Sequence, residues 1–250
     1  MALGGVEHGA AKLANSARER KSEAAIPPTI GVLTVPMRCA HGVLPHDCAA
    51  VLLDINAKNP EPRKIERAVE LLRRGGVIAY PTDTVYGLGC DITNRQAIDR
   101  IRRMKRMQEG QLVSFVCPDL SDIARYGIVQ DYAYRIMRRL VPGPYTFILQ
   151  ATRDVPKVLH QKRKTVGIRV PNHPVALALA SALGSPVAST SASLEGEIFF
   201  DPREIEQRFG DVDLVLDTDG VGLTPSTIVD LSGDEPVVVR HGAGAVDFLT

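Results

Sequence analysis

From residue 51 onward, the hydrophobic and polar positions follow regular periods that predict alternating helices and strands. Residues 61–76 carry apolar side chains at helical spacing, namely Ile65, Ala68, Val69 and Leu72. Gly75 follows them as a C-terminal stop signal. The stretch therefore predicts an amphipathic helix with one buried side.

The remaining elements are predicted in the same way. Helical spacing appears in residues 94–107, 120–127, 130–143, 173–184 and 201–210. Short apolar runs predict strands in residues 76–81, 112–117, 145–152, 165–171, 186–193, 213–217, 226–231 and 236–242. Because helices and strands alternate and no segment repeats, we expect a layered α/β (α+β) domain over residues 51–250.

Residues 1–50 lack this regularity. They are rich in Ala, Ser and Gly, with mixed charge and no strong period. We expect a flexible N-terminal extension or an over-long translation start. A further alternative is a zinc site, but the spacing of Cys39, His41, His46 and Cys48 is unlike that of a zinc finger, so no metal ligand is predicted.

Length and composition limit the protein class. The chain has 250 residues, of which 44% are hydrophobic, and a formal net charge of +1. This is enough for one large domain or two small ones. No apolar run approaches the 18 residues of a membrane span. The four cysteines follow no secretory signal, so we expect a cytoplasmic protein without membrane contact.

The charge is unevenly distributed. Residues 95–169 contain 16 Lys/Arg and 6 Asp/Glu, a net of +10, which leaves −9 for the rest of the chain. One interpretation is solvated helix faces. The other is a positive region that attracts phosphate. The low aromatic content disfavours base stacking as the main way of binding.

Hydroxyl side chains gather where predicted strands begin or end. The residues in question are Thr82, Thr84, Thr146, Ser189, Ser191 and Ser226. Loops at strand ends commonly bind ligands in open α/β sheets, and hydroxyls beside glycines suit phosphate or amino-acid ligands. The alternative is that Ser and Thr are ordinary turn and cap residues.

Two arginines, Arg169 and Arg240, end apolar strands. Each must reach solvent or a partner, because burying an unpaired charge is costly. Each could hold a carboxylate or phosphate, or form a strand-end ion pair. The chain has no phosphate-binding G-x-x-x-x-G-K-[ST] loop, no G-x-G-x-x-G after a strand and no G-x-S-x-G elbow. We therefore predict no catalytic nucleophile, and expect catalysis by positioning and charge stabilisation.

Five stretches in this order resemble the YrdC-like superfamily. They are "GGVIAYPTDTVYGLGC", "VPGPYTFIL", "VGIRVPNHPVALALASALGSPVASTSAS", "PSTIVDL" and "VVVRHGAG". The resemblance covers residues 52–244. It implies a three-layer fold with a twisted mixed sheet and a positive cavity. It also implies synthesis of threonylcarbamoyl-AMP from L-threonine, bicarbonate and ATP, with Mg²⁺ carried by ATP and no permanently bound cofactor.

The resemblance also implies roles for individual residues. Thr82, Thr84 and Arg169 would contact threonine, or in the case of Arg169 a phosphate. Residues expected around the nucleotide are Lys105, Arg106, Thr146, Ser189, Ser191, Ser226 and Arg240.

Two departures from the family pattern point to the YciO-like branch. The K-x-R motif reads "MKRMQEGQ", so either Met107 replaces the arginine or Arg106 takes its place and the lysine is lost. The S-x-N motif reads Ser191-Ala192-Ser193, in which a hydroxyl replaces an amide. Two functions stay open: a threonylcarbamoyl-AMP synthase, or a non-catalytic module that binds double-stranded RNA or tRNA.

Overall fold

The computed structural model describes residues 50–247, apart from residues 109, 110, 112, 157, 158, 160–163, 219 and 220. Residues 1–49 of the expected extension, including the Cys39–Cys48 stretch, lie outside the described residues. Ala50 is already buried in the core, so the packed part of the chain begins no later than this residue.

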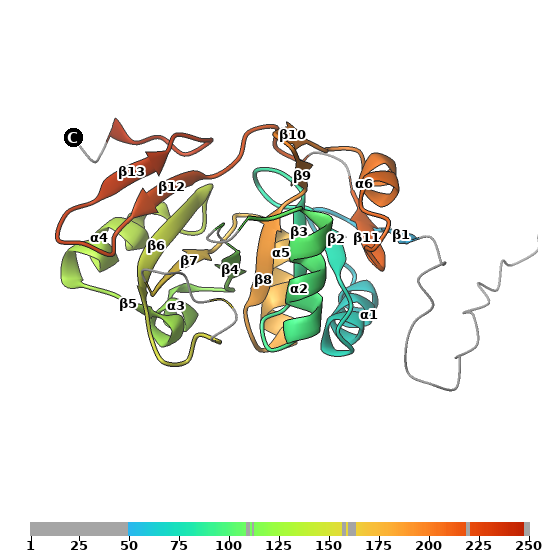
Figure 1. Ribbon diagram of the computed structural model, residues 1–250, viewed down its shortest axis with the longest axis horizontal. Helices are drawn as coiled ribbons and strands as arrows, with labels where there is room; N and C mark the ends of the chain where they lie inside the picture. Colours follow the sequence, from blue (N-terminus) through green and yellow to red (C-terminus); the bar gives the residue numbers. More distant parts are fainter. Residues whose placement is uncertain are drawn as a thin grey trace, which may run out of the picture. The chain divides into compact units, whose positions relative to one another are not determined.

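The described residues form helices and strands in alternation (Figure 1). The helices are α1 (Pro62–Arg73), α2 (Arg95–Met104), α3 (Leu120–Tyr126), α4 (Asp131–Leu140), α5 (Pro174–Leu183) and α6 (Pro202–Arg208). The strands of the first half are β1 (Val51–Asp54), β2 (Ile78–Tyr80), β3 (Gly87–Asp91), β4 (Ser114–Val116), β5 (Gly127–Ile128) and β6 (Tyr145–Ala151). Those of the second half are β7 (Thr165–Arg169), β8 (Val187–Ser191), β9 (Ser193–Leu194), β10 (Glu197–Ile198), β11 (Leu214–Asp217), β12 (Thr227–Asp230) and β13 (Val237–Arg240).

Most of these strands belong to one mixed 11-stranded sheet. Its order is β1-β11-β2-β3-β8-β4-β7-β6-β12-β13, and β5 pairs with the C-terminal end of β6. Neighbours are parallel at β1–β11, β11–β2, β4–β7 and β6–β12, and antiparallel elsewhere along this order. Strands β9 and β10 form a separate two-stranded sheet.

The core lies on both faces of the large sheet, which gives three layers. On one face, α1 and α5 pack on alternate residues of the strands, such as Ile78 and Tyr80. On the other face, α2, α3, α4 and α6 pack on the intervening residues, such as Val77 and Ala79. This alternation follows from the pleat, which points successive side chains to opposite faces. The expected three-layer fold with a mixed sheet is confirmed.

The helix predictions correspond closely to the observed helices. In α1, the four apolar residues at helical spacing are the buried ones. In α6, Asp201 caps the first turn by accepting a hydrogen bond from the Arg203 backbone N–H, with Pro202 in the first turn.

One central strand was not predicted. Residues 87–91 form this strand, β3, although their sequence carries no strand signal. The glycines fit there because a Cβ atom on Gly87 would lie 3.0 Å from Ser189 Oγ and 3.1 Å from the Tyr80 ring. Ser189 and Ser191 lie within β8, inside the strand predicted over residues 186–193.

Candidate functional site

The predicted hydroxyls share one face of the large sheet. Pairing between neighbouring strands places one residue of each of β8, β4, β7 and β6 in a single row across the sheet. These residues are, in the same order, Ser189, Ser114, Gly167 and Ile148. Two positions away on their strands, Ser191, Arg169 and Thr146 face the same side. The candidate site is therefore built on a sheet face, beside the area that α5 covers, and not only on loops.

The loop after β2 holds two of the predicted threonines. Thr82 Oγ1 donates its hydrogen to the Val85 carbonyl at 2.7 Å and accepts from the Thr84 backbone N–H at 3.2 Å. Because a hydroxyl has only one hydrogen, Thr84 must donate in the 3.1 Å bond between the two hydroxyls. Thr82 is thus fully engaged in shaping the loop, and Thr84 Oγ1 keeps only acceptor capacity.

A buried charge cluster lies next to this loop. Arg169, at the end of β7, forms an ion pair with Asp83 through Nη2 and Oδ1, and the two side chains are only 11% and 12% exposed. Asp83 Oδ2 and Arg169 Nε are buried and have no hydrogen-bond partner. The pair therefore keeps one free acceptor and one free donor of opposite charge.

His173 joins this cluster from the start of α5. The residue is 7% exposed, and its Nδ1 is buried without a hydrogen-bond partner. Burial lowers the pKa of His173, and the negative charge of Asp83 opposes this shift without cancelling it. The imidazole is thus neutral at physiological pH.

The N-terminus of α5 adds the partial positive charge of a helix dipole to this cluster. His173 occupies the N-cap position, but its side chain makes no capping hydrogen bond, and a proline follows it. The amides of the first turn therefore receive no side-chain cap, and the helix dipole favours a negative group nearby.

Arg240 and two hydroxyls form a second group on the same side of the sheet. Arg240 donates to the Ser226 carbonyl from Nε at 3.1 Å and from Nη2 at 2.7 Å. Ser226 Oγ lies 2.9 Å from Thr146 Oγ1. One of these two hydroxyls must donate to the other, so one O–H hydrogen of the pair stays available. Burial lowers the pKa of Arg240, and the positive charge of Arg169 lowers it further.

Lys105 links the end of α2 to the bend between β8 and β9. Its ammonium donates to the Ser191 carbonyl and to Ser193 Oγ, at 2.8 and 2.7 Å, and also contacts the Ser193 carbonyl. The hydroxyls of Ser191 and Ser193 lie 3.0 Å apart. Burial lowers the pKa of Lys105 to about 8. The lysine is therefore committed to protein oxygens.

The structure brings together nine of the ten predicted site residues as neighbours of this sheet face. Arg106 is the exception, because it is 70% exposed and forms an ion pair with Glu195. Sequence reasoning gave no role to Asp83, to His173 or to Tyr80, whose hydroxyl donates to Ser189 Oγ at 2.7 Å. A carboxylate inside a hydroxyl-rich loop was the one signal that could have identified Asp83.

The described residues contain no group of three His, Cys, Asp or Glu side chains that could hold a metal ion. Nor do they contain a helix long and apolar enough to cross a membrane.

Comparisons with known proteins agree with the fold. The Sua5/YciO/YrdC family model, described as "Telomere recombination", matches residues 70–242. The chain is 46% identical over 196 residues to the uncharacterized protein YciO of Escherichia coli, which covers 77% of this chain and 95% of YciO. The crystal structure of E. coli YciO superposes with a TM-score of 0.78, covering 80% of this chain and all of YciO.

Two further relatives carry functional names. A threonylcarbamoyl-AMP synthase of Halorhodospira halophila is 39% identical over 134 residues, which are 53% of this chain and 70% of that synthase. The crystal structure of P. abyssi Sua5 complexed with L-threonine has a TM-score of 0.71 at 27% identity, and the match covers 77% of this chain and 58% of Sua5.

Proposed function

Because the chain belongs to the Sua5/YciO/YrdC family, we propose that it makes threonylcarbamoyl-AMP and pyrophosphate from L-threonine, bicarbonate and ATP. This reaction is the first step of threonylcarbamoyladenosine formation in tRNA. The proposal extends to this chain the activity that gives the H. halophila relative its name.

The observation that carries the proposal is the pair of free atoms in the buried ion pair. Asp83 Oδ2 is a buried acceptor with negative charge, and Arg169 Nε is a buried donor with positive charge. An α-amino acid carries an ammonium and a carboxylate on one carbon, so it can satisfy both atoms at once. The uncapped first turn of α5 adds a second attraction for the carboxylate.

In the proposed reaction, the threonine ammonium first releases one proton to solvent. The free amine nitrogen then forms a bond to the carbon of bicarbonate, and water leaves. An oxygen of the resulting carbamate then attacks the α-phosphorus of ATP, and the bond to the pyrophosphate breaks. No group of the protein becomes covalently attached, so the work of the site is to position and to stabilise charge.

The second group of residues suits the nucleotide. The Thr146–Ser226 pair has a hydrogen to donate, and Arg240 supplies a positive charge beside it. Lys105 could meet a phosphate only by leaving its three protein oxygens. Mg²⁺ enters this scheme bound to ATP, as part of the substrate.

The test is release of pyrophosphate by the purified chain with ATP, L-threonine and bicarbonate. We expect release that needs all three substrates and that is lost in Arg169→Ala. An Arg103→Ala variant, altered on the exposed side of α2, serves as a control. Absence of release, or release that is independent of threonine, would contradict the proposal.

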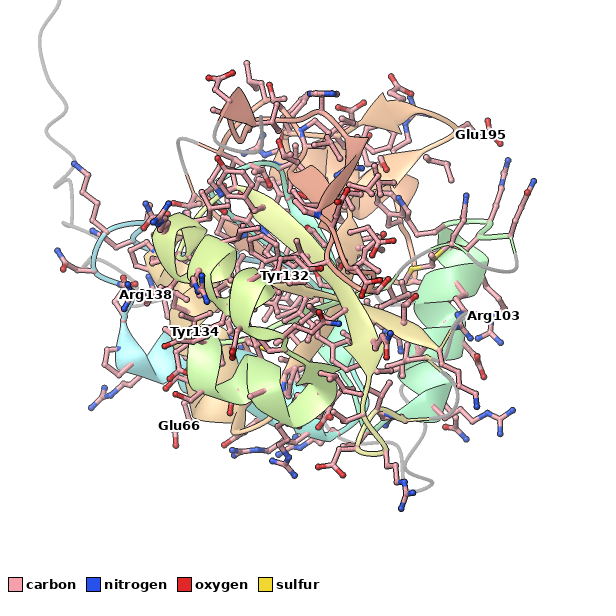
Figure 2. All side chains as sticks on the ribbon, turned by 90° about the vertical axis from the view of Figure 1, so that its left-hand side faces the viewer. Glu66, Arg103, Tyr132, Tyr134, Arg138 and Glu195 are labelled. Carbon is pink, nitrogen blue, oxygen red and sulfur yellow. The ribbon has the colours of Figure 1, made fainter. Side chains whose placement is uncertain are left out.

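A second candidate function is binding of double-stranded RNA or tRNA, which a specific surface favours. Arg135, Arg138 and Arg139 are exposed on α4 and form no ion pair with any described residue. Tyr134 lies among them and is 48% exposed. Figure 2 shows Tyr134 and Arg138 on the outer side of this helix. Three free guanidinium groups beside an exposed ring suit phosphates and a nucleotide base.

A further inference from the structure

Buried polar atoms without a hydrogen-bond partner are concentrated in one place. Among the described residues, four buried side-chain nitrogen or oxygen atoms lack a partner. Three of them are Asp83 Oδ2, Arg169 Nε and His173 Nδ1, whereas the fourth, Arg100 Nε, lies on α2. Leaving such atoms unpaired is unfavourable, so three in one cluster indicate a ligand with three polar groups.

The first two atoms match the charged ends of an amino acid, but the third does not. His173 is neutral, since burial lowers its pKa. A neutral ring nitrogen adds no charge to the site and offers one hydrogen-bonding position. In L-threonine, the remaining polar group is the side-chain hydroxyl.

Of the two neighbouring threonines, Thr82 has no hydrogen-bonding capacity left for a ligand, and Thr84 could only accept a hydrogen from the substrate hydroxyl. The Thr82 hydroxyl gives its hydrogen to Val85 and accepts two hydrogen bonds. The Thr84 hydroxyl gives its hydrogen to Thr82, so it can only accept. An imidazole nitrogen and a hydroxyl can form a hydrogen bond in either direction, depending on which imidazole nitrogen carries the hydrogen.

We propose that His173 Nδ1 binds the side-chain hydroxyl of the amino-acid substrate and thereby selects a β-hydroxy amino acid over an apolar one of the same shape. This inference rests on the proposed function, because it assumes that the Asp83–Arg169 pair holds an amino acid. His173 is then a specificity-determining residue and does not take part in bond making.

Calorimetric titration of the full chain with L-threonine and L-valine tests this proposal. Valine has the shape of threonine with a methyl group in place of the hydroxyl. We expect the wild-type chain to bind threonine roughly tenfold to a hundredfold more tightly than valine. In His173→Leu, threonine affinity should fall by that factor while valine affinity stays the same.

A matched variant separates selectivity from packing. His173→Asn keeps a polar group close to the Nδ1 position and is favourable at an N-cap, so it should retain the preference for threonine. If His173→Leu weakens threonine and valine binding equally, the ratio of the two affinities does not change. His173 then has only a structural role, and the proposal is wrong.

A measurement on the wild-type chain covers the case in which His173→Leu does not fold. In ¹⁵N NMR spectra of the imidazole groups, saturating L-threonine should shift the Nδ1 signal of His173, and L-valine should not. Binding of threonine without such a shift overturns the inference while the amino-acid site stands. Failure of the wild-type chain to bind threonine overturns the proposed function, and the inference falls with it.

Discussion

Arg169 and Asp83 lie 86 positions apart in the sequence and form an ion pair that is almost completely shielded from water. The structure therefore gives Arg169 a partner in folding as well as a free Nε for a ligand. Replacing Arg169 should therefore lower the stability of the fold as well as weaken ligand binding.

We expect Arg169→Ala to lower the free energy of unfolding by about 3–5 kcal/mol, because it leaves the Asp83 carboxylate buried without its partner. Urea denaturation measures this quantity. The control is Arg106→Ala, which removes an arginine from an exposed ion pair with Glu195 and should cost about 1 kcal/mol or less. Equal losses in the two variants would mean that the buried pair has no special role in stability.

Ser193→Asn should tighten ATP binding, because an amide is restored where the family has asparagine. A hydrogen bond to a charged group contributes about 1.5–3 kcal/mol, or roughly tenfold to a hundredfold in affinity. Calorimetry with ATP measures the change, and Ser193→Ala is the control that only removes the hydroxyl. Affinities that stay the same in both variants would show that position 193 does not reach the nucleotide.

Met107→Arg tests the other departure from the family motifs. Met107 is partly buried against the core, so we expect a lower melting temperature together with tighter ATP binding. In combination with Ser193→Asn, the gain in affinity should exceed that of either single variant. If neither the single nor the double variants improve binding or adenylate formation, these positions do not limit the protein.

The lowered pKa of Lys105 predicts that the free energy of unfolding changes with pH in the alkaline range. Burial lowers its pKa from 10.5 to about 8. Between these two values the unfolded chain holds a proton that the folded chain has released. The contribution of Lys105 to the free energy of unfolding therefore rises with pH across this window and is constant below it.

The comparison that isolates this contribution is wild type against Lys105→Met. Urea denaturation at about pH 7 and about pH 10 should show the wild type gaining stability relative to the variant as the pH rises. A difference that is constant with pH, or that shrinks, would contradict the lowered pKa of Lys105.

RNA binding, if α4 provides it, should depend steeply on salt. Each phosphate contact contributes about 0.9 to the slope of log K against log salt concentration. Replacing Arg135, Arg138 and Arg139 by Ala should therefore reduce the slope of a double-stranded RNA titration by up to about 3. Replacing Arg63 and Arg67 on α1 and Arg74 directly after it removes the same charge elsewhere and should leave the slope unchanged. A tight complex that ignores salt would require base-specific contacts.

The sequence predicts the layers of the fold well, because burial in α1 follows helical periodicity and the inner strands β2, β6 and β7 are continuous apolar runs. It fails at β3, where Gly87 and Gly89 look like turn residues. Only the structure reveals that the Tyr80 ring packs over both glycines. Strand pairing also decides that Ser189 and Ser191 face the same side as Arg169, and no local pattern contains that information.

The candidate site, too, could be predicted only in part, because its assembly depends on strand pairing. Hydroxyls and arginines stand out as residue types, so most members of the site could be named. The roles of Asp83 and His173 depend on which partner each atom finds or lacks. Such partners come from distant parts of the chain, and they become visible only after the strands are placed.

The hydrogen bonds of Thr82 have a consequence for the rate at which a ligand is captured. They fix the backbone of residues 82–85 in the absence of any ligand. The conformational entropy of this loop is thus lost during folding and does not oppose association. Thr82→Val, which removes the hydroxyl, should consequently slow productive encounters with the ligand even though Thr82 itself has no hydrogen left to offer it.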